Sequence, residues 1–125
     1  MREIKFRGIA LYGVDFICGS LLIETNEAGR VEYFIKRNTS KIQATEETVG
    51  QYTGLKDKNG VEIYEGDVCH IFTNDKTKIV FHMGAFGYWI WNNKDYRKFI
   101  PLCQDNISTY YIEVVGNIYQ NQELL

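Results

Sequence analysis

Four side chains near the middle of the chain have the chemistry of metal ligands: Asp67, Cys69, His70 and His82. Zinc sites in short loops usually use paired ligands such as Cys-x-x-Cys, and that spacing does not occur here. Cys69 and His70 are adjacent on a predicted strand, so their side chains point to opposite faces. Alternation places the side chains of Asp67 and Cys69 on the same face of this strand, although Gly66 leaves the phase of the alternation undetermined. We therefore expect no metal and no cofactor, with Cys69 buried and His70 at the surface or across from a neighbouring strand.

Two carboxylates flank a glycine in "YEGDV", Glu65 and Asp67. Carboxylates a few ångströms apart can act as general acid and base. The simpler interpretation is a turn in which Asp67 accepts hydrogen bonds from nearby backbone amides. The chain has no Gly-x-Ser-x-Gly motif, and "GLKDKNG" lacks the ending of a phosphate-binding loop. The sequence therefore predicts a protein that is not an enzyme.

The predicted strand "FGYWIWNN" concentrates aromatic side chains. Alternation places Phe86, Tyr88 and Ile90 on one face and Trp89 and Trp91 on the other. One face must be core, and the other packs on another element, forms a subunit contact or offers a stacking platform for bases. Which tryptophan is buried stays open, because a one-residue slip of register exchanges the two faces.

Basic residues lie near this strand and at a second place in the sequence. Lys76 and Lys78 precede the strand, and Lys94, Arg97 and Lys98 follow it. The run "KDK" at 56–58 is predicted to be a solvated hairpin tip, and it is kept as a candidate contact because loop tips often carry function. The candidate binding residues are Tyr88, Trp89, Trp91, Lys76, Lys78, Lys56 and Lys58.

The elements that must position these side chains are predominantly strands, because the apolar pattern has a period of two. The predicted strands are "REIKFRGI", "FICGSLLIET" with a bulge at Gly19, "VEYFIKR", "VEIY", "VCHIF", "KIVFHM", "GAFGYWIWNN" and "YYIEVVGNIYQN". Turns are predicted at "NEAGR", "DKNG", "EGD" and "TNDKT", with positive φ accommodated at Asn59-Gly60 and at Gly66. Helix is limited to one turn each in "QATEET" and "QNQELL".

Composition supports one mainly β domain over residues 1–125. The chain has nine Tyr, seven Phe and two Trp, an enrichment that suits pleated surfaces. The net charge is −2, from 14 basic and 16 acidic residues, which weighs against unspecific binding to a nucleic-acid backbone but leaves room for a local basic patch. Three separated cysteines form no disulfide framework, and no apolar run is long enough to span a membrane. We therefore expect a cytoplasmic protein.

Three separated motifs together resemble one family. The string "GQYTGLKDKNGVEIYEGDV", the closing "IEVVGNIYQNQELL" and the opening "MREIKFRG" are similar to the YopX family of phage and prophage proteins. "DFICGSLLIE" is similar to a further strand of that family, with Phe16 where tryptophan is frequent, and Gln122 stands where proline is expected. The resemblance implies a small SH3-like barrel or roll with an added N-terminal β-hairpin and little helix, and an origin in a phage or prophage. It implies no activity and no site residues.

The residues and the resemblance together favour an accessory binding module inside a bacterial host cell. We expect its partner to be another protein or a second copy of the chain. The alternative is a small β module that binds nucleic acid with an aromatic and basic strand. A metal-dependent enzyme is the least favoured function.

Overall fold

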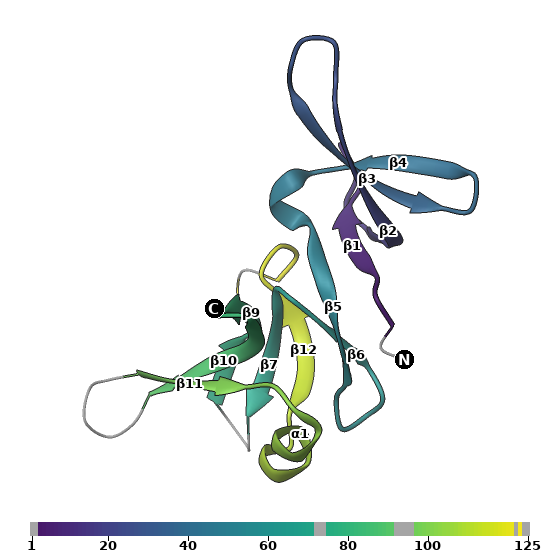
Figure 1. Ribbon diagram of the computed structural model, residues 1–125. Helices are drawn as coiled ribbons and strands as arrows, with labels where there is room; N and C mark the ends of the chain where they lie inside the picture. Colours follow the sequence, from purple (N-terminus) through teal and green to yellow (C-terminus); the bar gives the residue numbers. More distant parts are fainter. Residues whose placement is uncertain (1–2, 72–74, 92–96, 122, 124–125) are drawn as a thin grey trace. The chain divides into compact units, whose positions relative to one another are not determined.

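The computed structural model describes residues 3–71, 75–91, 97–121 and 123, and within them the chain is mainly β (Figure 1). The strands are β1 Phe6–Ile9, β2 Phe16–Thr25, β3 Val31–Arg37, β4 Ser40–Ala44, β5 Gly50–Lys56, β6 Glu62–Tyr64, β7 Asp67–Ile71, β8 Asp75–Lys78, β9 Val80–His82, β10 Ala85–Trp91, β11 Arg97–Pro101 and β12 Glu113–Asn117. A 3₁₀ turn, η1, covers Glu46–Thr48, and one α-helix, α1, covers Gln104–Tyr110. No helix in the described ranges has the length and hydropathy needed to cross a membrane.

The contacts group the residues into two compact units, 1–52 and 53–125. In the first unit the strand order is β4-β3-β2-β1-β5, all antiparallel where their register is defined. The predicted hairpin of β2 and β3 is confirmed, with Thr25 opposite Val31. Gly19, where we expected a bulge, lies where β2 passes from β1 to β3. A Cβ atom there would be 2.3 Å from the carbonyl oxygen of Lys36, so the position requires glycine.

The second unit contains two three-stranded antiparallel sheets, in the orders β12-β7-β8 and β11-β10-β9, and the pair β5-β6. One stretch of chain, residues 75–82, supplies β8 to one sheet and β9 to the other, with the buried Ile79 between them. The Ile79 amide donates to the Asp67 carbonyl at 2.8 Å, which holds this corner against β7. Apolar side chains from both sheets, from β6 and from α1 form the core: Ile63, Cys69, Ile71, Ile79, Tyr88, Ile107 and Ile112.

The prediction of a mainly β fold with little helix is confirmed, but the described strands do not close into a barrel. The two three-stranded sheets approach each other at β8 and β10. There the Thr77 hydroxyl donates to the Trp89 carbonyl at 3.1 Å, a side-chain hydrogen bond in place of a backbone ladder. A closed barrel requires continuous backbone pairing around its circumference. In this protein the two sheets share the chain segment 75–82 and one hydrophobic core, but each sheet keeps its own edge strands.

Several elements differ from the sequence-based prediction. β4, β5, β11 and α1 were not predicted, whereas the turn in "QATEET" is confirmed as η1. The predicted strand "KIVFHM" is wrong as a single strand, because the chain divides at Ile79 into β8 and β9, and of the predicted strand "YYIEVVGNIYQN" only Glu113–Asn117 forms β12. The predicted turn "TNDKT" lies partly outside the described residues, and β8 already begins at Asp75. Half of "QNQELL", residues 122, 124 and 125, also lies outside them. The expectation of one domain over residues 1–125 stays a prediction.

Candidate binding surface

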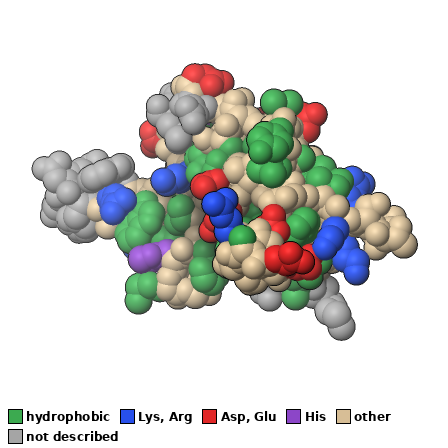
Figure 2. Space-filling model, turned by 90° about the horizontal axis from the view of Figure 1, so that it is seen from above, with side chains coloured by type: hydrophobic (Ala, Val, Ile, Leu, Met, Phe, Trp, Pro, Cys, Tyr) green, Lys and Arg blue, Asp and Glu red, His purple; other side chains and the backbone are tan. Residues whose placement is uncertain are grey.

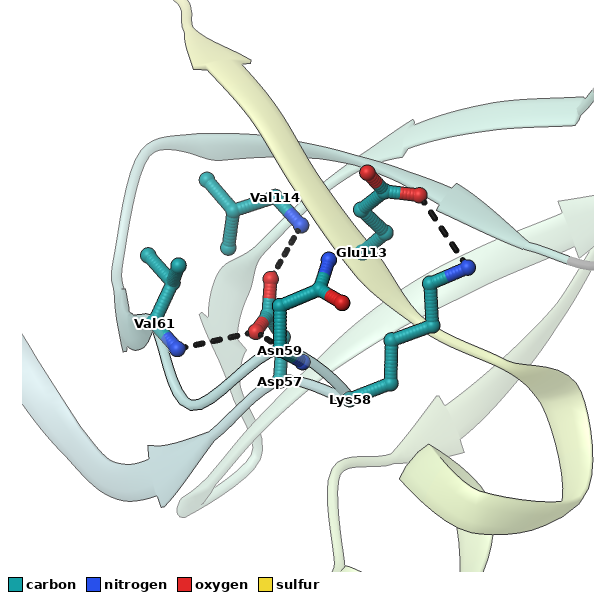
Figure 3. Close-up of polar contacts among 6 residues, drawn as sticks. All are labelled: Asp57, Lys58, Asn59, Val61, Glu113 and Val114. Atoms are coloured by element: carbon teal, nitrogen blue, oxygen red, sulfur yellow. Dashed lines mark hydrogen bonds and ion pairs between the residues drawn. The ribbon is translucent and has the colours of Figure 1, made fainter.

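The turn between β5 and β6 is tied to a distant strand by the carboxylate of Asp57 (Figure 3). Its Oδ1 accepts from the amides of Asn59 at 2.8 Å and Val61 at 2.9 Å, which closes the turn. Its Oδ2 accepts from the amide of Val114 in β12 at 2.9 Å. Only 6% of Asp57 is exposed, so these bonds form in a largely dry environment. Of the predicted Asn59-Gly60 pair, only Gly60 has a positive φ, 82°.

The "KDK" run is therefore more than a solvated hairpin tip. The backbone amide of Lys58 donates to the Ile112 carbonyl at 3.2 Å. The side-chain Nζ of Lys58 lies 3.2 Å from a carboxylate oxygen of Glu113 (Figure 3). Lys56 is exposed at the end of β5. Because Asp57 and Lys58 attach the turn to β12, the main role of this turn is structural. A partner contact at Lys56 and Lys58 stays a prediction.

The "YEGDV" turn also serves the fold, as predicted. The Asp67 Oδ2 accepts from the Tyr64 amide at 2.7 Å, and Asp67 is 1% exposed. Gly66 has φ 92°, and a Cβ there would lie 2.9 Å from Cε2 of Tyr119. Asn117 orders the segment that carries this ring, because its Oδ1 accepts from the Tyr119 amide at 3.0 Å. The central and closing motifs thus meet at Gly66 and Tyr119.

The four candidate metal ligands are not gathered into one site. Cys69 is fully buried and His70 half-buried, as the alternation predicts. Burial, and then the nearby Asp67, raise the pKa of the Cys69 thiol, so it stays protonated at neutral pH. His82 lies among aromatic rings. Within the described ranges, no group of three or more His, Cys, Asp or Glu side chains is arranged to hold a metal ion.

Strand β10 has the two faces that alternation predicts. Tyr88 is 1% exposed and belongs to the core, so this candidate residue lies inside the protein instead of on a contact surface. Trp89, on the other face, is half-buried. The side chain of Trp91 lies outside the described residues. Register, which the sequence left open, is set by pairing Trp89 with Phe99 of β11.

The buried hydroxyl of Tyr88 has no hydrogen-bond partner within the described part of the chain. The ring borders a small apolar cavity of about 30 Å³, lined by Ile71, Tyr88, Ile90, Ile100 and Tyr110. An unpaired buried hydroxyl destabilises a fold by about 1–3 kcal/mol. Tyr88→Phe is therefore expected to raise the free energy of unfolding by about 1 kcal/mol at pH 7, measured by urea denaturation. A loss of stability instead would show that the hydroxyl contributes a favourable interaction.

The same substitution is expected to change the alkaline stability. Burial, with smaller effects of Tyr110, Cys103 and Cys69, raises the pKa of Tyr88 from 10.0 to about 12. The fold thus favours the neutral phenol, and this contribution is complete below pH 10 and is lost as the pH rises from 10 to 12. Two pKa units correspond to about 3 kcal/mol. The difference in stability between Tyr88→Phe and wild type should therefore widen across this range, and a constant difference would contradict the shift.

Trp89 belongs to a cluster of rings on the face of the β11-β10-β9 sheet away from the core, which we call the ring cluster: His82, Trp89, Phe99 and the stacked Arg97. The Trp89 centroid lies 4.9 Å from that of His82 and 5.3 Å from that of Phe99, both edge to face. The Arg97 guanidinium lies 4.8 Å from the Trp89 centroid. Phe99 leans over Gly87, where a Cβ would be 2.5 Å from its Cζ. The rings mainly contact each other.

The two β8 lysines do not join this cluster. The Thr77 side chain turns toward β10, so Lys76 and Lys78 project to the opposite side of β8, and both are exposed. The cation that stacks on Trp89 is Arg97, which the candidate set did not contain. Arg97 follows Trp91 at no regular spacing, and only the register of β11 against β10 brings it back to this face.

Two large apolar side chains are exposed near the turn between β9 and β10, and we call them the exposed tip: Phe81 in β9 and Met83 in the turn. His82 pairs with Ala85, so the turn consists of Met83 and Gly84. Phe81 is 56% exposed and Met83 is 91% exposed. Sequence reasoning did not select either residue, because "FHMG" contains none of the Asn-Gly or Asp-Gly pairs that mark such turns.

Charge is unevenly distributed around these features. Residues 76–101 contain five basic and one acidic residue, which leaves nine basic and fifteen acidic residues for the rest of the chain. The structurally described parts of this segment, 76–91 and 97–101, carry Lys76, Lys78, Arg97 and Lys98 and no carboxylate side chain. Figure 2 shows basic side chains in blue, acidic ones in red and hydrophobic ones in green together on the face in view. The segment is thus a local basic, apolar region within an acidic chain.

Comparison with known proteins identifies the family. Protein EF1440 from Enterococcus faecalis, known from a crystal structure, has a similar fold, with a TM-score of 0.62 at 23% identity over 100% of this chain and 99% of that one. The DNA polymerase II large subunit of Methanococcus vannielii is 40% identical over 76 residues, 61% of this chain, although the chain spans only 6% of that subunit. The family model described as YopX protein matches residues 17–125. Since this match covers most of the chain, the protein belongs to the YopX family.

Proposed function

We propose that the protein is a non-enzymatic binding module that contacts another protein through the exposed tip, Phe81 and Met83. The observation that carries the proposal is the exposure of Phe81 and Met83 at the end of a sheet in which the rings of His82, Trp89 and Phe99 contact one another. Methionine, aromatic residues and arginine are enriched at protein interfaces. The acidic and thiol groups of the central motif support a non-enzymatic role, because Asp57 and Asp67 bind backbone amides and Cys69 stays protonated.

The proposal extends to the setting of the protein. We infer that it acts in the cytoplasm of a bacterium and is encoded by a phage or prophage, in line with the family motifs. None of the described cysteines, Cys18, Cys69 and Cys103, forms a disulfide, which suits a reducing compartment.

The first experiment is recovery of the tagged protein from a bacterial host, with and without nuclease, followed by reconstitution with the purified partner. We expect a protein partner that survives nuclease and binds wild type at least tenfold more tightly than Phe81→Ser. Phe81 is suited to this test because more than half of it is exposed. Equal binding by Phe81→Ser, with the fold intact by circular dichroism, would contradict a contact at the tip.

A second candidate function is binding of single-stranded nucleic acid. Two observations favour it: the basic segment without described carboxylates, and the similarity to part of a DNA polymerase subunit. Basic grooves with aromatic rings bind single strands by charge and stacking. Against it, the Trp89 ring contacts His82, Phe99 and the Arg97 guanidinium, so little of it is available to a base.

Labelled dT20 tests this second candidate by fluorescence anisotropy. Nucleic-acid binding requires an affinity that falls steeply as salt rises, because each phosphate contact releases a counterion. Arg97→Ala would then weaken binding and reduce the salt dependence, whereas Arg30→Ala, at an exposed position in the turn between β2 and β3, serves as a matched charge control. Absence of binding at 50 mM salt removes this candidate.

A further inference from the structure

We propose that one face of the β12-β7-β8 sheet, which carries Lys76, Lys78 and His70, binds the phosphate backbone of a single-stranded nucleic acid. We call it the basic face. It belongs to a different sheet from the exposed tip, so the inference goes beyond the proposed protein contact and does not depend on it. It also places the nucleic-acid contact on other side chains than those of the ring cluster.

Strand register brings the polar side chains of the basic face together. His70 of β7 lies opposite Glu113 of β12 on one side and opposite Lys76 of β8 on the other. Directly opposite residues of an antiparallel pair point to the same face, with their Cβ atoms about 5 Å apart. Lys78 is two residues beyond Lys76 on β8 and therefore projects to the same face. The other face of β7 is the core side, because Cys69 belongs to the core.

Positive charge is in excess on the basic face. Lys76 and Lys78 are exposed, and their side chains form no ion pair with a described residue. Glu113 is the only carboxylate that the described register places on this face, and Nζ of Lys58 lies 3.2 Å from one of its oxygens. Asp75 is out of phase with the two lysines of β8, so its side chain projects to the opposite face. An anionic ligand would therefore complement this face.

The lack of exposed apolar side chains beside these cations favours a phosphate backbone over a protein. None of the large apolar side chains that are exposed in the described residues belongs to β7, β8 or β12. Protein interfaces are centred on buried apolar or aromatic anchors, and these three strands expose none.

Contacts to phosphates need only cations and hydrogen-bond donors. Lys76 and Lys78 supply the cations, and the imidazole of His70 supplies a donor beside Lys76. The two lysines are about 7 Å apart along the strand, which is close to the spacing of successive phosphates in an extended single strand. The basic face thus fits two neighbouring phosphates.

The test is fluorescence anisotropy of labelled dT20 with the purified protein, beginning at 50 mM salt. Two phosphate contacts on a single strand predict a slope of about −1.4 for log K against log salt concentration. Lys76→Ala and Lys78→Ala should each weaken binding about fivefold and reduce the slope to about −0.7. Arg30→Ala removes the same charge from the exposed turn between β2 and β3, and it should leave the affinity unchanged.

A variant with the opposite effect separates charge from structure. Glu113→Gln removes the carboxylate of the basic face and releases Lys58, so dT20 should bind about two- to threefold more tightly. Lys76→Arg keeps the cation and should bind like wild type. Phe81→Ser should also bind dT20 like wild type, so a failure at the exposed tip and a failure at the basic face are separate results.

Three results would overturn the inference. Unchanged affinity for Lys76→Ala and Lys78→Ala, with a loss for Arg97→Ala, would assign the contact to the ring cluster. A peptide of twenty glutamates that binds as tightly as dT20 would make the ligand an acidic polypeptide. No binding of dT20 at 50 mM salt would refute the inference and leave the proposed protein contact standing.

Discussion

Replacing Asp57 by alanine is expected to lower the free energy of unfolding by about 3 kcal/mol. The substitution removes the acceptor of three backbone amides, those of Asn59, Val61 and Val114, at a position only 6% exposed. Each buried amide left without an acceptor costs about 1–3 kcal/mol, and water entering the turn recovers part of the total. Urea denaturation followed by circular dichroism measures the loss.

The neighbouring Lys58→Ala is the matched control. Its ion pair with Glu113 spans 3.2 Å, but the two side chains are 41% and 37% exposed, so we expect a change below about 1 kcal/mol. The loss of stability for Asp57→Asn should fall between those for Asp57→Ala and Lys58→Ala. The side-chain oxygen of asparagine still accepts from the amides of the turn, but its NH₂ group faces the Val114 amide and cannot accept a hydrogen bond from it. Equal losses for Asp57→Ala and Lys58→Ala would contradict the role assigned to the carboxylate.

Gly66→Ala is expected to destabilise the protein by a similar amount, about 3 kcal/mol. Part of the loss comes from φ 92°, which alanine adopts at a cost of about 1–2 kcal/mol. The rest comes from the new Cβ, 2.9 Å from Cε2 of Tyr119. The backbone is not free to move aside, because the Gly66 amide and carbonyl bond to Ile79 at 2.8 Å and Ile118 at 3.0 Å.

Gly60→Ala separates the two causes. Gly60 has φ 82°, close to that of Gly66, but a Cβ there meets no atom within 4 Å, so we expect a loss of about 1 kcal/mol. In a double-mutant cycle, Tyr119→Ala should recover part of the loss at Gly66 and none at Gly60. If the two alanine variants prove equally stable, the steric contribution of Tyr119 is absent.

Local pattern predicted those parts of the fold whose stability is local. The hairpin of β2 and β3 was predicted correctly, because "NEAGR" and the flanking alternation determine both register and face. The two faces of β10 were predicted from alternation alone. The elements that were missed depend on distant contacts. α1 has seven residues and no side-chain N-cap, so its stability depends on tertiary contacts such as the burial of Ile107 in the core.

The candidate site was predicted less well, because a contact surface depends on register and packing between strands. Sequence reasoning selected Tyr88, which lies in the core. It noted Arg97 as a basic residue near the strand without placing it in the candidate set, and it did not consider Met83. The role of Asp57 was invisible for a related reason, since its partner Val114 lies 57 residues further along the chain. A lysine-flanked aspartate in a turn gives no local sign of a bond over that distance.

The 57 residues between Asp57 and Val114 also determine the order in which contacts form while the chain is being synthesised. The pairs within residues 1–52 are complete before most of the second unit has been translated. The turn at Asp57 can close early through Asn59 and Val61, but Oδ2 must wait for Val114, and β7 must wait for β12. At about 5–20 residues per second this is a delay of several seconds. A nascent chain on the ribosome would therefore carry a folded first unit while the edge of β7 that pairs with β12 is still unpaired. An unpaired strand edge can pair with other chains, so we expect this intermediate to need protection from aggregation.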